Sequence, residues 1–292
     1  MKILDQIGTG SYGIVYKAQR RNMEVAVKML KFSQAAEKTF VKETSIMFKL
    51  KHPNIVTLLG VIEKPTAIIT EYYPNGDVCE LAMNLNYVID EEHVRKICLD
   101  TCQGMAYLHS LNILHRDLKS RNLLIDKDWN IKVGDFGLAR SMNDSGSFTS
   151  CGTPSHVAPE IINDSQYTAK VDVYSFGICI YEIVIRRKPY GNLQALQIAV
   201  SVAKEGIRPN IPPNTPLIWE ALMCECWDED PEARPSFDTL IEKLEQLELP
   251  EPSRPTPYKS KQNSYSSASE EYLNTRRGST ATSTTSNSFM NS

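Results

Sequence analysis

The residues with the clearest capacity for chemistry begin near the start of the chain, in a glycine-rich run. Gly8, Gly10 and Gly13 alternate with polar residues and are followed by Val15. Glycine lets backbone N–H groups approach phosphate oxygens closely, because no Cβ atom intervenes. β-branched residues follow, so the run predicts a strand–turn–strand flap, whereas a dinucleotide-binding fold would open a helix here. Taken alone, the run fits a hairpin without a ligand equally well.

A lysine at the end of an apolar run is the second informative feature. Lys28 directly follows the strand-like segment 25–27. Burying an ammonium group in such a strand is costly unless an acid pairs with it. Glu43 lies on the next predicted helix, residues 34–49, and is the natural partner. We therefore expect an ion pair between Lys28 and Glu43.

Three further polar groups follow in a fixed order. They are His115-Arg116-Asp117-Leu118-Lys119 with Asn122, then Asp135-Phe136-Gly137, then Ala158-Pro159-Glu160. With the glycine run and Lys28, these five elements resemble the signature set of the eukaryotic protein kinase family in order and rough spacing. One tripeptide of this kind is common by chance, but the ordered set is highly specific. The resemblance covers about residues 1–248.

The resemblance implies an ATP-dependent phosphotransferase. Transfer of the γ-phosphate requires charge neutralisation and alignment more than covalent help. Asp117 resembles the carboxylate that accepts the proton of the substrate hydroxyl, and Lys119 resembles the cation that neutralises the migrating group. Lys28 resembles the lysine that holds the α- and β-phosphates, with Glu43 orienting it.

The implied metal ligands are Asn122 and Asp135, whose side-chain oxygens suit a hard cation. The resemblance assigns Mg²⁺ to them, with Mn²⁺ as an alternative. Every polar position carries the residue expected of an active kinase. This argues against the rival interpretation, a catalytically silent scaffold with the same fold.

The resemblance also assigns the surface that binds ATP. The implied residues are Gly8, Gly10, Gly13, Val15, Ala26, Lys28, Thr70, Glu71, Tyr73, Asp77 and Leu124. Among them, Thr70 would guard the back of the adenine pocket, and Glu71 and Tyr73 would contact adenine through backbone groups. Asp77 would reach the ribose.

Other residues resemble the structural supports of the family. Glu160 is expected to pair with Arg234, and Asp172 to brace the loop that carries Asp117. A stack of apolar and aromatic side chains is expected from His115, Phe136, Met47 and either Leu59 or Leu58.

Two regions indicate which hydroxyl is phosphorylated. Lys119 lies two positions after Asp117, and the loop 152–157 contains Thr153, as in serine/threonine kinases. We expect Thr153 to form hydrogen bonds near Asp117 and Lys119. His156 departs from the pattern, because such kinases commonly have Tyr or Trp there. This puts in doubt the shape of the pocket for the residue after the acceptor.

The last part of the domain resembles a different group of protein kinases. Cys226-Trp227 and the segment 231–237 resemble tyrosine kinases and their tyrosine kinase-like relatives. The combination resembles the tyrosine kinase-like group, whose members mostly act on serine and threonine. Protein substrates are therefore expected, with tyrosine or dual-specificity activity as the alternative.

The pattern of elements predicts an α+β, two-lobed protein kinase fold. Short β-branched runs predict strands at 14–16, 25–27, 55–59 and 67–70. Apolar periodicity predicts helices at 34–49, 91–109, 194–205 and 237–247, and a buried core helix at 171–185. The expected kinase domain spans 1–248, with a small β-rich N-lobe at about 1–70, a hinge at 71–77 and a larger helical C-lobe at 78–248. Residues 249–292 are rich in Ser and Thr and are expected to form a disordered tail.

Composition excludes several classes of function. The 292 residues carry a formal net charge of -3, so nothing global points to nucleic acid or an anionic membrane. No membrane segment is expected. The seven cysteines show no zinc-binding spacing and indicate thiols in a reducing cytoplasm. Few residues precede Gly8, so the sequence leaves open whether the protein has a further region upstream of residue 1.

The segment between Asp135 and Ala158 carries candidate regulatory hydroxyls. Ser145, Ser147, Thr149 and Ser150 could be phosphorylated by an upstream kinase, and such a phosphate could pair with Arg116 and Arg140.

Overall fold

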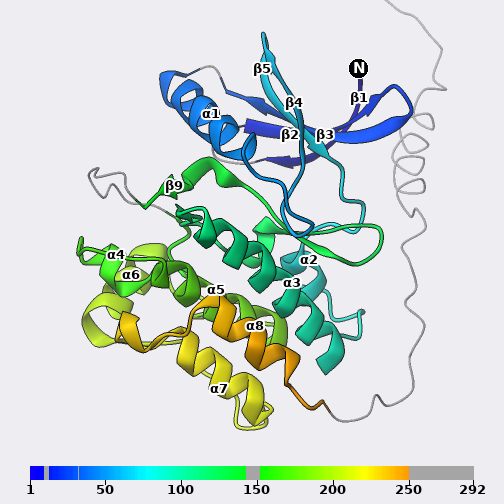
Figure 1. Cartoon of the computed structure of the whole chain (residues 1–292). Helices are drawn as coiled ribbons and strands as arrows, with labels where there is room; N and C mark the ends of the chain where they lie inside the picture. The colour runs from blue at the N-terminus through cyan, green and yellow to red at the C-terminus, as the bar shows by residue number, and fades with distance from the viewer. Residues whose placement is uncertain (10–12, 32, 143–151, 250–292) are drawn as a thin grey trace, which may run out of the picture. The chain divides into compact units, whose positions relative to one another are not determined.

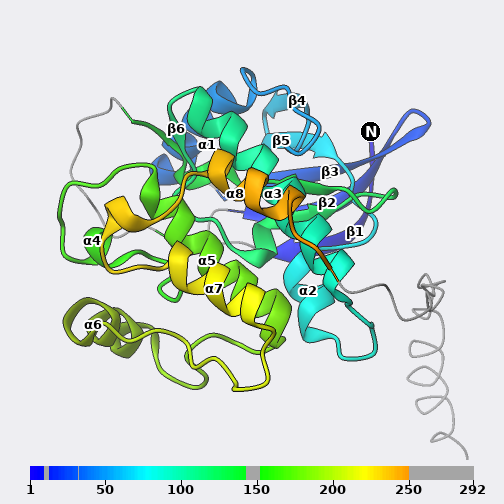
Figure 2. The same cartoon turned by 60° about the horizontal axis from the view of Figure 1, so that its bottom comes forward.

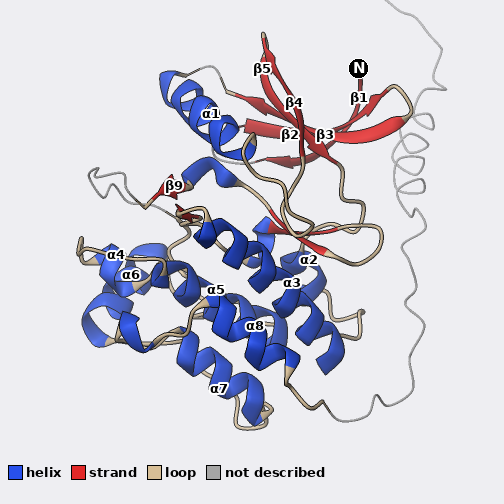
Figure 3. Ribbon diagram, in the orientation of Figure 1, coloured by secondary structure: helices blue, strands red, loops and turns tan. Residues whose placement is uncertain are grey.

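A five-stranded antiparallel sheet forms the first part of the chain (Figures 1 and 3). The computed structural model describes residues 1–9, 13–31, 33–142 and 152–249, and gives the backbone alone for 34–36. The strands lie in the spatial order β1-β2-β3-β5-β4. Their bounds are β1 (Lys2–Thr9), β2 (Gly13–Arg20), β3 (Met23–Leu30), β4 (Leu58–Glu63) and β5 (Thr66–Glu71).

The alternation of side chains in β3 explains why this segment forms a central strand. Val25 and Val27 are buried in a small apolar cluster with Ala18, Ala67 and Ile69. Successive side chains of a strand point to opposite faces, so Ala26 and Lys28 lie on the other face. The sequence of β3 thus fixes which face Lys28 occupies.

Helix α1 (Gln34–Met47) packs against β3, β5 and the short 3₁₀ turn η2 (Phe136–Leu138). Figure 1 shows it beside the sheet and above β9. It ends two residues before the predicted limit of 49. Its position allows Glu43 to face Lys28.

The segment after β5 connects the sheet to the helical part. Residues 72–76 have no regular structure, and Asp77 caps the N-terminus of α2 (Val78–Met83) by accepting a hydrogen bond from the backbone of Glu80 at 2.8 Å. The predicted hinge began at residue 71, whereas Glu71 still belongs to β5.

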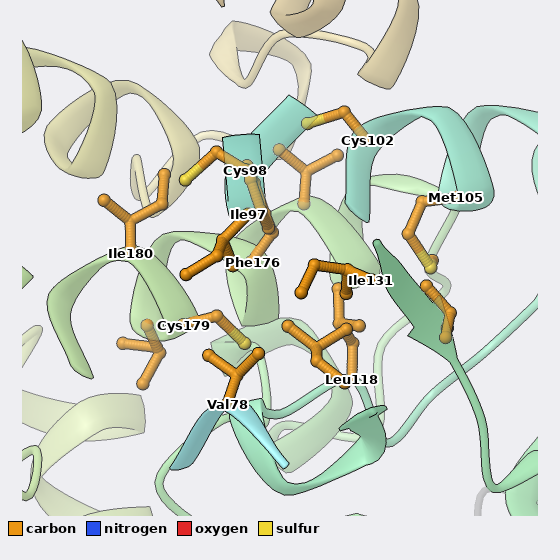
Figure 4. Packing of buried hydrophobic residues seen from close by; sticks show 14 of the residues in the cluster. Val78, Ile97, Cys98, Cys102, Met105, Leu118, Ile131, Phe176, Cys179 and Ile180 are labelled. Carbon is orange, nitrogen blue, oxygen red and sulfur yellow. The ribbon is translucent and has the colours of Figure 1, made fainter. Parts of the chain in front are cut away.

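The remainder of the domain is mainly helical (Figure 2). Its longer helices are α3 (Glu91–Ser110), α5 (Lys170–Ile185), α6 (Ala195–Glu205), α7 (Leu217–Cys226) and α8 (Phe237–Glu245), and α4 (Pro159–Ile162) is short. Thirteen of the sixteen residues of α5 are buried, which confirms the predicted core helix. Figure 4 shows Phe176, Cys179 and Ile180 of this helix packed with apolar side chains of α3.

Two small antiparallel ribbons hold the segments that carry the polar motifs. One ribbon pairs β6 (Ile113–Leu114) with β9 (Arg140–Ser141), and the other pairs β7 (Leu123–Ile125) with β8 (Ile131–Val133). The 3₁₀ turn η1 (Ser120–Asn122) leads directly into β7. The ribbons therefore fix both ends of the segments around Asp117 and Asp135.

One predicted strand is wrong. Residues 55–59 were expected to form a strand of the sheet, but β4 covers Leu58–Glu63. Instead, Ile55 bridges to Val133 of β8, and the Val56 N–H donates to the carbonyl of Val133 at 2.9 Å. The apolar side chains at 55 and 56 are buried in the large core cluster, so packing overrides their strand propensity.

The predicted two-lobed α+β fold is confirmed by the sheet and the helical part. In the part of the chain that the structure describes, no helix is both long and apolar enough to cross a bilayer. The expected phosphorylation sites Ser145–Ser150, Gly10 of the glycine run and the expected tail from residue 250 onward lie outside the described residues.

Candidate active site

Lys28 of β3 links the sheet, α1 and the segment after β8. Its Nζ atom lies 2.8 Å and 3.1 Å from the two carboxylate oxygens of Glu43 and 3.0 Å from Oδ1 of Asp135. The predicted ion pair with Glu43 is therefore present. Asp135 joins it, although 107 positions separate it from Lys28.

The charges of this trio shift the pKa values of its members in different directions. Burial alone would lower the pKa of Lys28, but the carboxylates of Asp135 and Glu43 raise it. Burial raises the pKa of Glu43, and Lys28 offsets only part of this rise. Desolvation by neighbouring groups opposes ionisation of Asp135 too, although its side chain is 47% exposed, and the nearby ammonium of Lys28 outweighs it and lowers the pKa of Asp135. At neutral pH the site thus presents an ammonium and an ionised Asp135 side by side.

Asp117 lies in a second polar group, on the segment before η1. Its Oδ2 accepts a hydrogen bond from Lys119 Nζ at 2.6 Å, and its Oδ1 accepts from the backbone N–H and the hydroxyl of Thr153, both at 2.9 Å. Lys119 Nζ also donates to the Thr153 hydroxyl at 2.9 Å. The expected contacts of Thr153 with Asp117 and Lys119 are confirmed. The carboxylate is held with its oxygens beside a cation and a hydroxyl group.

Asn122 connects the two polar groups. Its side-chain amide nitrogen donates to the backbone carbonyl of Asp117 at 2.8 Å. Its backbone carbonyl accepts from the Gly134 N–H at 2.9 Å. His115 contacts the Gly134 carbonyl through Nε2 at 2.9 Å. Because Gly134 directly precedes Asp135, these bonds fix Asp135 relative to Asp117.

Asp135 itself has a left-handed backbone conformation, with φ at 61°. Such φ values are uncommon for residues other than glycine, and conformations of this kind gather at functional sites. A Cβ atom at Gly134 would lie 2.7 Å from Cγ2 of Val56. Position 134 therefore requires glycine for its close approach to Val56.

The expected supports are present. The buried carboxylate of Asp172 accepts hydrogen bonds from the backbone N–H groups of His115 at 2.9 Å and Arg116 at 2.8 Å, and lies 2.9 Å from Nε2 of His109. Glu160 pairs with both guanidinium nitrogens of the buried Arg234, at 2.6 Å and 3.1 Å.

The aromatic part of the predicted stack is present, and the structure decides between its two leucines. The rings of His115 and Phe136 lie with centroids 5.5 Å apart. Leu58 packs against the core cluster that contains Met47 and Phe136, whereas Leu59 packs against the small cluster of the sheet. Of the two leucines, Leu58 is therefore the one that packs with the core containing Met47 and Phe136.

The residues expected to surround adenine lie around the connection between the two lobes. Ala26 of β3 pairs with Thr70 of β5, and Leu124 of β7 bridges to Asp77 at the start of α2. Val15 of β2 pairs with Lys28 on one side, and Gly8 of β1 pairs with Val15 on the other. A Cβ atom at Gly13 would lie 2.4 Å from the Met29 carbonyl, so this glycine permits a close strand contact.

Two of these side chains have partners that the sequence did not predict. The buried Tyr73 hydroxyl accepts a hydrogen bond from the Thr57 N–H at 3.2 Å and donates to Glu71 at 3.2 Å. The pKa of Asp77 is raised by burial, opposed mainly by its capping hydrogen bond.

The matching family accounts for this arrangement. The model of the protein tyrosine and serine/threonine kinase family matches residues 1–244. The chain belongs to this family. A kinase domain implies ATP and a divalent metal ion, and protein substrates.

Relatives of this kinase domain carry kinase names. It is 38% identical over 255 residues to "Probable serine/threonine-protein kinase drkA" of Dictyostelium discoideum, covering 85% of this chain and 40% of that protein. It is 39% identical over 253 residues to "Serine/threonine-protein kinase STY46" of Arabidopsis thaliana, covering 85% and 44%. A third relative, 36% identical over 246 residues, is "Dual specificity protein kinase pyk3" of Dictyostelium discoideum, of which 18% is covered. The chain spans less than half the length of these relatives.

Proposed function

We propose that this chain transfers the γ-phosphate of ATP to serine and threonine hydroxyls of proteins. The observation that carries the proposal is the environment of Asp117. Its carboxylate lies within hydrogen-bonding distance of Lys119 and Thr153, in a loop fixed to Asp135. A carboxylate in this position can accept the proton of an acceptor hydroxyl and align the oxygen for attack.

We assign the other charged residues to the phosphates. Lys28 would hold the α- and β-phosphates, with Glu43 orienting its ammonium group. Lys119 would neutralise charge on the migrating phosphoryl group. Preorganised cations of this kind stabilise charge that develops in the transition state.

The donor atoms of Asn122 and Asp135 fit a hard divalent cation, for which we propose Mg²⁺, with Mn²⁺ as the alternative. The amide nitrogen of Asn122 is engaged by Asp117, so its oxygen is the ligand atom, and Asp135 offers a carboxylate of lowered pKa. When bound, the ion supplies positive charge to the phosphates. The ammonium group of Lys28, which Glu43 also holds, keeps Asp135 ionised and oriented for that role.

We propose that ATP binds between the sheet and β7. The side chains of Val15, Ala26 and Leu124 would enclose the adenine, with Thr70 behind it. The backbone at Glu71 and Tyr73 would bind the adenine edge, and Asp77 the ribose. The glycines at 8, 10 and 13 would cover the phosphates.

The proposed serine/threonine specificity rests on the residues around Asp117, and the proposed membership of the tyrosine kinase-like group rests on these residues combined with Cys226-Trp227 and the segment 231–237. Lys119 and Thr153 contact the same carboxylate, as the serine/threonine interpretation of these positions requires. The names of the relatives support the same choice, and the dual-specificity relative keeps tyrosine as the second candidate. We also propose a reducing compartment, the cytoplasm, because the six cysteines in the described ranges are free thiols.

Transfer of labelled γ-phosphate to a generic basic protein, with Mg²⁺ or Mn²⁺, tests the proposal. Phosphoamino-acid analysis of the product should show phosphoserine and phosphothreonine, and Asp135→Asn should abolish the transfer. Predominant phosphotyrosine would reverse the assigned specificity. Equal incorporation of label with wild type and Asp135→Asn would mean that the label does not come from this site. That result, or no incorporation of label with either metal ion, would support the silent scaffold.

A further inference from the structure

The loop that contains Thr153 is held at two points. At one point Thr153 contacts Asp117, as described above. At the other, Nε2 of the buried His156 lies 3.2 Å from Oε2 of Glu182 on α5. The sequence singled out His156 as a departure from the kinase pattern, and the structure shows what the imidazole contacts.

The carboxylate of Glu182 is shared with the segment that carries Asp117. The hydroxyl of Ser120, which directly follows Lys119, donates to the same Oε2 atom at 2.5 Å. One buried oxygen thus receives a hydrogen bond from the loop 152–157 and one from η1. Burial opposes ionisation of Glu182, but the hydrogen bonds from His156 and Ser120 outweigh it and lower its pKa.

Backbone contacts connect the two points rigidly. The His156 N–H donates to the Thr153 carbonyl at 2.8 Å, which closes a tight turn between the two residues. The His156 carbonyl accepts from the Ser175 hydroxyl of α5 at 2.7 Å. A displacement of the His156 ring from Glu182 therefore moves the turn that places Thr153 on Asp117.

The second ring nitrogen of His156 has a partner of its own. Nδ1 lies 3.0 Å from the Ser155 hydroxyl. If the hydroxyl donates to Nδ1, then Nε2 carries the hydrogen that Glu182 accepts, and both nitrogens of a neutral ring are satisfied. The Cys179 thiol lies within 4.8 Å of both His156 and Glu182, but the imidazole and the carboxylate are already engaged by hydrogen bonds.

We propose that His156 is a positioning residue for the acceptor. Through Glu182 and Ser120 it fixes Thr153 against Asp117, and so sets where the loop 152–157 presents the hydroxyl of a protein substrate. This inference rests on the proposed function. It extends that function to a contact that phenylalanine at position 156 could not make, because a phenyl ring has no donor for the Glu182 carboxylate.

Three variants of the full chain separate this role from simple packing. His156→Phe keeps a ring but removes the donor, His156→Gln keeps an N–H donor, and Ser155→Ala removes only the partner of Nδ1. For each, kcat and KM are measured with a serine peptide at saturating Mg²⁺–ATP, and the KM for ATP is measured at saturating peptide. Hydrogen exchange of residues 152–157 is followed without substrate.

We expect His156→Phe to lower kcat/KM for the peptide about tenfold, which corresponds to the loss of one charge-assisted hydrogen bond. The KM for ATP should stay within about twofold of wild type, and exchange of 152–157 should rise. His156→Gln should recover most of the loss, and Ser155→Ala should cause a smaller loss than His156→Phe, because Nε2 keeps its contact with Glu182. Equal losses in His156→Phe and His156→Gln, a parallel rise in the KM for ATP, or an unchanged kcat/KM would overturn the proposal.

The shared oxygen gives a separate test of the connection through Glu182. If His156 and Ser120 act through one carboxylate, the loss in the double variant Ser120→Ala/His156→Phe should be at least about threefold smaller than the product of the single losses. Independent, multiplying losses would refute the connection. If wild type transfers no phosphate, the proposed function fails. Unchanged hydrogen exchange of 152–157 in His156→Phe would then refute the positioning role on its own.

Discussion

The carboxylate of Asp172 offers the sharpest test of how the fold supports the site. It is fully buried and accepts backbone hydrogen bonds from His115 and Arg116, at different oxygens, with His109 as a third partner. Asp172→Asn keeps the shape but replaces one acceptor oxygen by an NH₂ group. In either orientation this group faces a backbone N–H, so at least one bond is lost and one buried N–H loses its partner.

The magnitude follows from these contacts. A hydrogen bond to a charged group contributes about 1.5–3 kcal/mol, and an unsatisfied buried donor adds about 1–3 kcal/mol, so we expect a loss of about 3–5 kcal/mol. For a domain of this size that lowers Tm by roughly 10 °C. Urea unfolding measures the change. The matched control is Asp128→Asn, at an exposed carboxylate whose nearest cation is Lys127 at 3.8 Å, which should change the free energy of unfolding by less than about 0.5 kcal/mol.

The pH dependence of this loss has a definite sign. Burial opposes ionisation of Asp172, but its hydrogen bonds from His109 and the backbone lower its pKa in the folded state. The carboxylate therefore stabilises the fold above its unfolded pKa of about 3.9, and this contribution disappears as pH falls through the lower folded pKa. The difference between wild type and Asp172→Asn should shrink in that acidic range. A difference below about 1 kcal/mol at pH 7 would refute this account.

Three further outcomes are expected. Glu160→Gln leaves the guanidinium of the buried Arg234 without its counter-ion, so the free energy of unfolding should fall by about 3 kcal/mol in urea. Gly104→Ala places a Cβ atom 2.7 Å from the Asn54 carbonyl; despite the helix-favouring effect of alanine of about 1 kcal/mol, overpacking of about 1–3 kcal/mol should leave the variant less stable in a thermal melt. Lys28→Met removes the cation proposed for the phosphates, and phosphate transfer should fall at least about a hundredfold.

Each of these outcomes has a result that contradicts it. An unchanged unfolding curve for Glu160→Gln would mean that the ion pair makes no net contribution to the free energy of unfolding. A raised Tm for Gly104→Ala would mean that the contact with the Asn54 carbonyl can be relieved without loss of stability. For Lys28→Met the matched control is Lys127→Met, at a side chain 81% exposed, which should retain full activity. Comparable activity in both lysine variants would remove Lys28 from the site.

The sequence predicted the contacts that depend on residue type at motif positions. The pairs Lys28–Glu43 and Glu160–Arg234 and the contact of Thr153 with Asp117 are all present. The first pair follows from the cost of burying a charge without a partner, whereas the other two contacts were implied by the resemblance to the kinase family. Motif spacing therefore carried most of the predicted site geometry.

The sequence failed where packing alone decides. Ile55 and Val56 have strand-forming side chains, but they pack in the core and contact Val133 of β8 instead of joining the five-stranded sheet. The partners of Glu182 were also missed, since Ser120 and His156 lie 62 and 26 positions away. One signal was available, because a carboxylate inside the apolar stretch 171–185 must find a partner when that helix is buried.

The position of Lys28 between two acids has a consequence for what sequence change can tolerate. In an isolated ion pair, exchanging the two residues can preserve the attraction. Here Lys28→Glu combined with Glu43→Lys would set a new carboxylate against Asp135, whose partner lies in the other lobe. Reversal would require three simultaneous replacements, and the third would replace the acid proposed as a metal ligand. The positive charge at position 28 is therefore required by two acids, Glu43 and Asp135, which come together only in the folded protein.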